Sequence, residues 1–455
     1  MSAIGAGVGG YGGGRGDKSL RMPLLETLRL AWADPEIRQR LLFVLLVFGI
    51  YALGTHVPVP IPNVNAATFE ELISKNAFFS LMNTIGGGSL KRISIFALGL
   101  NPYITSSIIM QILTSALPQW KKEMQEGGEY ARRQQNRRTR ALTLALCGFQ
   151  GWGLLQMMGS AIGAQTPWTL VTVIIFWTAG AMFMLWLGEQ VSEKGIGNGI
   201  SLMIFAGIVI SIPNMISQIM TAIGNQAVQW WQGIILAMLF LATTWLIVLF
   251  TIAQRRIPIQ HMRRQVGTRA VGGSTSYLPL SINLAGVIPI IFAISLIYMP
   301  AQFATMFGPD NGVGRVFATI ADFMRIDLHR WQGWVGALIY TFMIFFFTYF
   351  YTAIQYNVED IANNLKRGGS FIPGVRPGKQ TKEFLDGVIS RITIVGAFFL
   401  SIIALTQFFV PLIAPGIGSL NVSMLFGTSL LIMVSVALET MRQIEANLLM
   451  KQYGQ

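Results

Sequence analysis

Apolar residues recur along this chain in ten runs that approach or reach the length needed to cross a lipid bilayer. A membrane-spanning helix needs about 20 mostly apolar residues, because hydrocarbon offers no hydrogen-bond partner to an open backbone. The pattern therefore predicts an all-α polytopic membrane protein with ten transmembrane helices. The runs cover residues 41–57, 95–117, 141–163, 170–188, 200–221, 233–252, 278–302, 334–355, 388–413 and 420–438.

One further apolar run, residues 78–85, is too short to cross the bilayer and is followed at once by Gly86, Gly87 and Gly88. The span after it, 95–117, is interrupted by several polar residues. A short segment that enters the membrane and turns is tolerated only where protein or water surrounds it. We therefore interpret residues 78–117 as the lining and stopper of a pore. An amphipathic segment lying on the membrane surface beside an ordinary span would have the same composition.

The composition supports a membrane protein, since 53% of the residues are hydrophobic, only 12% are charged and the mean hydropathy is +0.54. These values exclude a soluble globular protein. The single cysteine, Cys147, lies inside an apolar run, so an intrachain disulfide cannot form. The glycine-rich N-terminus predicts a flexible segment.

Positive charge is distributed unevenly between the loops. Of the 33 Lys and Arg residues, 27 lie in the N-terminal segment, near the loops that follow even-numbered spans, or after the last span. The positive-inside rule then places both termini in the cytoplasm. Ten spans divide into two sets of five, and an odd number per half requires an inverted second half if the halves are repeats. We divide the chain into a cytoplasmic segment (1–36), two halves (37–222 and 223–438) and a cytoplasmic tail (439–455).

Two cytoplasmic loops, 253–277 and 356–387, are long and basic. Such charge clusters bind phosphate backbones, acidic protein surfaces or anionic lipid. Topology signals alone would also explain the charges, but that role needs only a few residues. The length of both loops favours a docking surface.

The interiors of the ten runs contain no Asp, Glu, Lys, Arg or His. Ion-coupled solute carriers place ionisable residues near the midplane, and intramembrane proteases need paired aspartates, a Ser/His pair or a metal motif, so both alternatives are disfavoured. The three histidines lie far apart in loops, and we expect no metal site and no cofactor. No phosphate-binding loop of the form GxxxxGK followed by Ser or Thr is present. We therefore expect a conduit without catalytic residues, powered from outside the chain.

Four stretches resemble signature sequences of the SecY family, the central channel subunit of the bacterial Sec translocon. They are FALGLNPYITSSIIMQIL (96–113), GAMFMLWLGEQVSEKGIGNGISLMIFAGIV (180–209), STSYLPLSINLAGVIPIIFA (274–293) and FIPGVRPGKQT (371–381). The similarity extends from residue 37 to about residue 435 and is weakest in the N-terminal segment and in the external loop 301–332.

The resemblance implies a clamshell of two five-helix halves around an hourglass pore in the bacterial plasma membrane, with a re-entrant plug helix. Unfolded polypeptides bearing signal peptides would cross through the pore, and apolar segments would leave sideways into membrane lipid. The exit would be a lateral gate between the second and third spans and the seventh and eighth, with Thr105 and Asn283 as polar gate residues. The implied partners are the subunits SecE and SecG, the motor ATPase SecA and the ribosome.

The resemblance also assigns individual residues. The pore ring maps onto Leu100, Ile104, Ile200, Ile204, Ile291 and Ile432. The plug maps onto residues 77–88, and the plug residues assigned individually are Ala77, Phe78, Phe79, Ser80, Leu81, Met82, Asn83, Thr84, Ile85 and Gly86. The docking residues for motor and ribosome are Arg255, Arg256, Arg263, Arg264 and Arg376.

Overall fold

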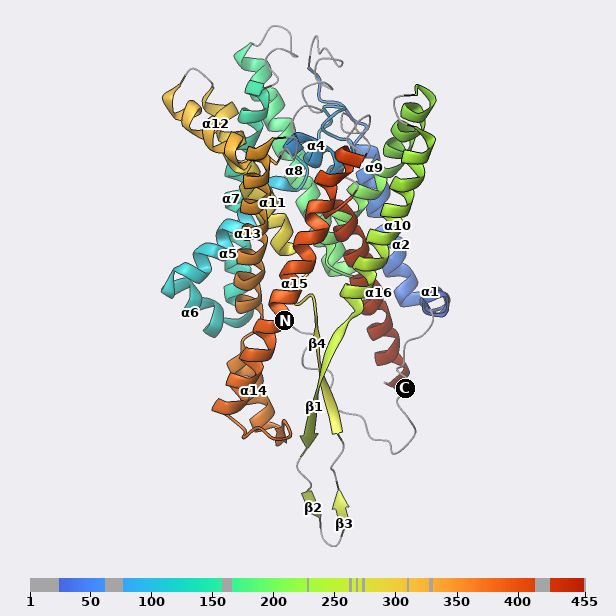
Figure 1. Cartoon of the computed structure of the whole chain (residues 1–455), viewed down its shortest axis with the longest axis vertical. Coiled ribbons are helices and arrows are strands. Elements are labelled where there is room, and N and C mark those ends of the chain that lie inside the picture. Colours follow the sequence, from blue (N-terminus) through green and yellow to red (C-terminus); the bar gives the residue numbers. More distant parts are fainter. Residues whose placement is uncertain are drawn as a thin grey trace.

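Ten long helices form the body of the computed structural model, which describes residues 24–61, 77–157, 166–226, 229–261, 264–266, 269–271, 275–308, 311–326, 330–413 and 426–453. They run along the long axis of the molecule, most of them steeply and some at a tilt (Figure 1). In chain order they are α2 (Pro35–Gly54), α5 (Asn101–Ala116), α7 (Gly128–Met157), α8 (Pro167–Lys194), α9 (Gly199–Gly224), α10 (Trp230–Ile252), α11 (Ile288–Phe307), α13 (Trp331–Gln355), α15 (Lys379–Ile413) and α16 (Thr428–Tyr453). Each overlaps one predicted apolar run, so the ten predicted spans are confirmed.

Six helical segments of the described chain are long and apolar enough to cross a membrane; they include all or most of α2, α8, α9, α10, α13 and α15. The other four helices fall short for local reasons. Helix α5 has only 16 residues, and the apolar part of α11 is the short stretch Ile288–Ala301. Helices α7 and α16 each combine an apolar part with a charged extension.

Two predicted spans begin too early. The second helix starts at Asn101 rather than at residue 95, because the chain turns through Gly99 at a positive φ of 55° and Pro102 favours a helix start. The seventh starts at Ile288, and residues 278–281 belong to a β-strand instead. That strand is apolar because it packs against α15, where Leu280 is buried in one cluster with Leu385.

The last helix also differs from its prediction. Helix α16 continues as far as Tyr453, so most of the predicted tail 439–455 is a helical extension of the tenth span. The ends of the third and tenth predicted runs, 158–163 and 420–425, lie outside the described residues.

Strands project from one end of the bundle, which we call the hairpin end (Figure 1). Strand β1 (Gln254–His261) is central in a three-stranded antiparallel sheet, between β4 (Thr275–Ser281) and β5 (Ser370–Phe371). The short strands β2 (Arg264–Val266) and β3 (Arg269–Val271) pair at the tip. The membrane body is helical as predicted, whereas the two basic loops contain strands that the apolar pattern did not predict.

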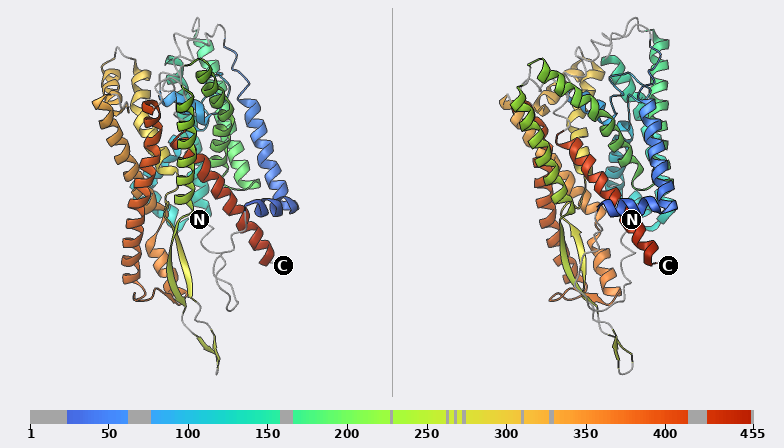
Figure 2. Two further views of the ribbon diagram at one scale, coloured as in Figure 1. Left: turned by 45° about the vertical axis from the view of Figure 1, so that its right-hand side comes forward. Right: turned by 90° about the vertical axis from the view of Figure 1, so that its right-hand side faces the viewer.

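The shorter helices lie at the two ends of the bundle. Helix α1 (Leu24–Ala33) lies across the long axis near the hairpin end, as Figure 2 shows, and α6 (Pro118–Glu126) and α14 (Val358–Arg367) lie toward the same end. Helices α4 (Ala77–Ile85) and α12 (Gly312–Met324) lie toward the opposite end. The largest hydrophobic cluster occupies the centre and draws residues from nine of the ten long helices.

Candidate functional site

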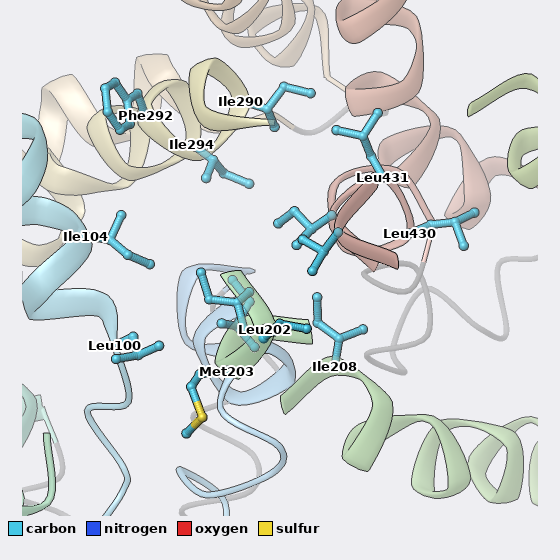
Figure 3. Close-up of a cluster of buried hydrophobic side chains, with 14 of the residues drawn as sticks. Leu100, Ile104, Leu202, Met203, Ile208, Ile290, Phe292, Ile294, Leu430 and Leu431 are labelled. Atoms are coloured by element: carbon cyan, nitrogen blue, oxygen red, sulfur yellow. The ribbon is translucent and has the colours of Figure 1, made fainter. Parts of the chain in front are cut away.

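Aliphatic side chains from four helices converge at the centre of the bundle. Figure 3 shows Ile104 of α5 and Ile294 of α11 directed toward the middle of this group, with Leu202 of α9 and Leu431 of α16 also bordering it. All four side chains are buried members of the main hydrophobic cluster. Both the early and the late helices of the chain therefore contribute to one apolar centre.

The structure brings all six predicted ring residues to this cluster. Four are buried: Leu100, Ile104, Ile204 and Ile432, with 3%, 8%, 5% and 1% of their surface exposed. Ile200 and Ile291 are half-buried and pack against the same cluster. Residues four apart on a helix share a face, so Ile200 and Ile204 of α9 point in a common direction, whereas Leu100 precedes α5 as its N-cap residue and Ile104 lies in its first turn.

Helix α4 lies within the protein, packed against α9. The side chains of Phe79, Ser80, Met82 and Thr84 are buried, while those of Ala77, Phe78 and Leu81 lie outside the described set. A helix lying on the membrane surface would turn its polar side chains to water, but Ser80 and Thr84 are buried, so that alternative is wrong and the prediction of a short segment enclosed by protein is correct.

The carboxyl end of α4 is held through its backbone. The Ser211 hydroxyl of α9 donates to the Thr84 carbonyl oxygen at 2.8 Å, and the Tyr51 hydroxyl of α2 donates to the Ile85 carbonyl oxygen at 3.4 Å. Gly207 of α9 permits this close approach, because a Cβ there would overlap the Ile85 carbonyl group. The last carbonyl groups of a helix have no partner within the helix, and here side chains of α2 and α9 supply partners.

A tight turn connects α4 to the central cluster. Gly87 and Gly88 adopt φ values of 69° and 81°, which favour glycine. The Asn83 side chain accepts the Lys91 backbone N–H at 2.9 Å, and the Ser89 hydroxyl donates to the Phe96 carbonyl oxygen at 3.0 Å. The three glycines after the short apolar run therefore reverse the chain toward Leu100.

We call the contact of α5 and α7 with α11 the gate seam; it lies on the left of Figure 1. Across it, the rings of Phe149 on α7 and Phe303 on α11 meet edge-on, with centroids 5.7 Å apart. Phe303 also meets Phe317 of α12 at 5.2 Å, and Phe317 stacks with Phe307 at 6.2 Å. Helix α12 therefore supports the α11 side of this aromatic contact.

Of the predicted polar gate residues, Thr105 lies on α5, at the gate seam, whereas Asn283 lies before α11, next to Leu284, which packs against α15. Among the described residues, no hydrogen bond joins the two. Thr105 donates to the Asn101 carbonyl oxygen within α5, at 3.0 Å. The side-chain oxygen of Asn283 is buried, and within the described part of the chain it has no hydrogen-bond partner. Ser106 and Thr143 join α5 to α7 through their hydroxyl oxygens, 2.6 Å apart, so these two helices behave as one side of the seam.

We call the contact of α16 with α1, α2 and α9 the hinge seam; it lies on the right of Figure 1. At the hairpin end, Ile444 and Leu448 of α16 are buried in a cluster with apolar residues of α1 and α2 and with Ile196. The Lys451 ammonium group lies 3.0 Å from an Asp34 carboxylate oxygen and 2.8 Å from a Glu36 carboxylate oxygen. This seam therefore combines apolar packing with ion pairs.

The predicted docking arginines lie at the hairpin end. Arg255 and Arg256 are exposed on β1, and Arg376 is exposed in the turn between β5 and α15. That turn contains two glycines at positive φ, and the Thr381 hydroxyl donates to the Arg376 carbonyl oxygen at 2.9 Å. Arg263 lies outside the described residues, and of Arg264 only the backbone, in β2, is described.

Comparison with known proteins decides the family. The family description SecY matches residues 94–441. The protein translocase subunit SecY of Streptomyces scabiei is 38% identical over 449 residues, which covers 94% of this chain and 99% of that protein. The chain belongs to the SecY family. The SecY subunit of Pseudomonas aeruginosa is 39% identical over 426 residues, which covers 92% of both chains.

Solved structures of SecY-type channels share the fold. One described as the structure of a protein conducting channel has a TM-score of 0.68, 19% identity and coverage of 93% of this chain and 97% of that chain. Another, of Sec61 in the canine ribosome-channel complex, has a TM-score of 0.64, 18% identity and the same coverage. The predicted ten-span helical fold with its enclosed short helix is confirmed, and this SecY-family chain is a protein translocase subunit that forms a membrane channel. The solute-carrier and protease alternatives are wrong.

Sequence reasoning missed the aromatic contact at the gate seam and the ion pairs of the hinge seam. Phe149 and Phe303 lie in or beside apolar runs, where aromatic residues facing lipid look the same as aromatic residues facing another helix. Lys451 and its partner Asp34 are 417 positions apart, and no local pattern links them. For Lys451, the sequence shows only a positive charge in the predicted C-terminal tail.

Proposed function

We propose that the central aliphatic cluster is the closed constriction of the channel and that α4 is its plug. The observation that supports this most is the convergence of Leu100, Ile104, Ile204 and Ile432, from α9, α16 and the start of α5, on one buried apolar cluster. In this proposal the hairpin end and both termini face the cytoplasm of a bacterium, and the constriction lies within its plasma membrane. The unequal distribution of Lys and Arg supports that orientation.

A constriction of aliphatic side chains suits a channel for polypeptides. Each elementary charge that leaks across the membrane dissipates about 2.3 kcal/mol per 100 mV, so the resting channel must exclude ions. Charged side chains would attract ions, and polar ones would keep the constriction wet. Aliphatic side chains close the path by dewetting and yield to a passing chain without binding it.

The test of the constriction is the triple substitution Ile104→Asn, Ile204→Asn and Ile291→Asn. We expect a channel that folds but conducts ions at rest, because three amides hydrate the constriction. Single-channel current across a planar bilayer without substrate measures this. The matched control replaces the same three residues by Val, which keeps the site apolar, and it should stay closed.

Deletion of residues 77–88 tests the plug in the same recording. We expect a smaller resting conductance than in the triple Asn variant, because the aliphatic constriction remains. A triple Asn variant as tight as the parent would place the seal elsewhere and overturn the assignment of the constriction. A deletion that leaks more than the triple Asn variant would make α4 the principal seal.

We further propose that residues 37–222 and 223–438 form two halves that separate at the gate seam, so that apolar segments pass sideways into lipid. The gate seam joins α5 and α7, from the first half, to α11, from the second. SecE and SecG are the proposed companion subunits. The chain supplies no catalytic residue in this proposal, and the energy comes from a motor ATPase, a ribosome or the membrane potential.

The basic loops at the hairpin end are the proposed docking sites. Arg376, presented in a glycine-containing turn, would engage the motor SecA, while Arg255 and Arg256 would engage the ribosome. Juxtaposed like charges cost several kcal/mol at interfaces, so Arg376→Glu should block motor-driven export from reconstituted vesicles. The nearby exposed Lys379→Glu is the matched control and should export at close to the parent rate. Export by Arg376→Glu at the parent rate would remove this arginine from the docking site.

A further inference from the structure

His261 bridges the two basic loops through both of its ring nitrogens. It is the last residue of β1, in the first loop. Its Nδ1 lies 2.8 Å from the hydroxyl oxygen of Ser370 on β5, in the second loop. Its Nε2 lies 3.1 Å from the hydroxyl oxygen of Ser276 on β4, which belongs to its own hairpin. One contact is therefore between loops, and the other is within a loop.

The backbone supports the same connection. His261 pairs with Ser370 and Gln260 pairs with Phe371 in the short antiparallel ladder between β1 and β5. This ladder has only two residue pairs, so its backbone hydrogen bonds alone hold the two loops together weakly. The Ser370 side chain is buried, and its hydroxyl also donates to the Gly368 carbonyl oxygen at 3.4 Å. The imidazole bridge therefore adds a partly buried, directional contact to a sheet of very few residues.

The chemistry of the bridge does not depend on the protonation state of the ring. A neutral imidazole has one donor and one acceptor, an imidazolium has two donors, and a serine hydroxyl can donate or accept. Ser370 and Ser276 can therefore satisfy His261 in every state. The bridge is a fixed positional contact.

The bridge lies close to the residues of both proposed docking sites. Arg256 is five positions before His261 on the same strand, and Arg376 is six positions after Ser370. Between Ser370 and Arg376, Ile372 is buried in a cluster with Ile257 of β1, so the start of the arginine turn is anchored to the same strand. A change in the separation of the two loops would change the separation of their arginines.

We propose that His261 is a positioning residue that joins the two basic loops into one rigid docking surface for a partner that contacts both loops at once. This rests on the proposed docking function, and it adds that the motor SecA, through acidic groups, contacts the first basic loop as well as the second. Two loops held in a fixed arrangement bind a shared partner more tightly than two loops that move independently, because less conformational entropy is lost on binding. Removing the hydrogen bond between the loops should weaken binding of such a partner roughly three- to tenfold.

Spin-label distances in the complete channel complex test the bridge without any partner. Labels at Cys residues replacing exposed Tyr277 on β4 and exposed Lys379 at the start of α15 report the separation of the loops. We expect a broader distance distribution for His261→Phe, which keeps a ring without hydrogen bonds, and for Ser370→Ala. Ser276→Ala, which removes only the contact within the hairpin, should match the parent.

Binding of purified SecA to the reconstituted complex is the second measurement. His261→Phe and Ser370→Ala should each weaken SecA binding by the stated factor, and the double variant should bind no more weakly than either single variant. Ser370→Thr, which keeps the hydroxyl, should restore binding.

Unchanged distance distributions in both His261→Phe and Ser370→Ala would overturn the bridge, whether or not SecA binding changes. Broadened distances with unchanged SecA binding would keep the bridge but overturn its role in docking. Normal SecA binding by Arg376→Glu would instead count against the proposed docking site itself.

Discussion

The gate seam and the hinge seam join the same two sets of five helices, but they are built from different interactions. The gate seam is joined by the aromatic contact of Phe149 with Phe303 and by the aliphatic side chains of the constriction. The hinge seam adds the ion pairs of Lys451 to its apolar packing. In addition, α9 ends at Gly224 and α10 begins at Trp230, so the two sets are also joined by a short stretch of chain.

This difference explains which seam can open in a membrane. Lipid tails are as apolar as leucine, so apolar side chains that separate at a lipid-facing seam can pack against lipid instead. A short covalent connection has no such replacement, whereas the exposed ion pairs can exchange with water and add little to the hinge seam. The gate seam is therefore suited to the proposed reversible opening, whereas the hinge seam is suited to holding the two proposed halves together.

Cross-linking the gate seam should have the largest effect. We expect a short bifunctional reagent joining Phe149→Cys to Phe303→Cys, in a Cys147→Ala background, to abolish sideways release of apolar segments and to block export. A channel whose gate seam cannot separate has no lateral exit. The measurement is insertion and export in reconstituted vesicles, before and after cleavage of the linker.

The same reagent on Asp34→Cys with Lys451→Cys is the control for the hinge seam. We expect near-normal transport, because that seam stays closed during the cycle. Equal inhibition by both cross-links would contradict the difference between the seams.

Weakening the aromatic contact should have an intermediate effect. An aromatic pair contributes about 0.5–1.5 kcal/mol beyond its buried area, so Phe303→Ala should shift the gate equilibrium toward the open state roughly two- to tenfold. The expected result is lateral release of segments that are too weakly apolar for the parent channel. A series of model segments of graded hydrophobicity measures this shift.

Phe307→Ala is the matched control for that substitution, because Phe307 stacks with Phe317 on the α12 side and does not contact Phe149 in the described aromatic pairs. It should leave the hydrophobicity threshold near that of the parent. The same shift in both variants would show that general loosening of α12, rather than the contact across the seam, controls the gate.

Removing the ion pairs of the hinge seam should have the smallest effect, since exposed ion pairs contribute little to stability. Hydrogen bonds from Lys451 and from the Ile37 backbone N–H lower the pKa of Asp34 below its ordinary 3.8. Hydrogen bonds to Glu36 and Asp34 raise the pKa of Lys451 above its ordinary 10.5. We expect Lys451→Ala to lower the thermal midpoint slightly at neutral pH.

The difference in thermal midpoint between the parent and Lys451→Ala should depend on pH, because the pKa of Asp34 is lowered and the pKa of Lys451 is raised in the folded state. The Asp34 contribution is complete above pH 3.8 and is lost as the pH falls through the lowered pKa of the folded state. The Lys451 contribution is complete below pH 10.5 and is lost as the pH rises through its raised pKa. Thermal midpoints of parent and variant should therefore converge at both extremes. A constant difference across the whole range would show that the packing of the lysine stem, rather than its charge, is responsible.

Much of the helical body could be predicted because a membrane imposes a length on each apolar run. The same reasoning failed at residues 278–281, where an apolar strand packed on α15 resembles the start of a span. The positions of Ile104 and Ile204 in the constriction came from family resemblance, because aliphatic residues at that spacing are common on any membrane helix. The role of Gly207 could not be predicted, because the sequence does not show that the Ile85 carbonyl group packs against this position of α9.

The way in which α4 is held has a consequence for how this segment can change over evolution. Ser211 and Tyr51 bind carbonyl groups, and Gly207 accommodates backbone, so the described contacts at the carboxyl end recognise the shape of the main chain rather than the identity of its side chains. These backbone contacts therefore place little constraint on residue type at the carboxyl end of α4, whereas Gly207, Ser211 and Tyr51 are constrained. The rest of the helix is constrained differently, because Phe79 and Met82 are buried in a hydrophobic cluster.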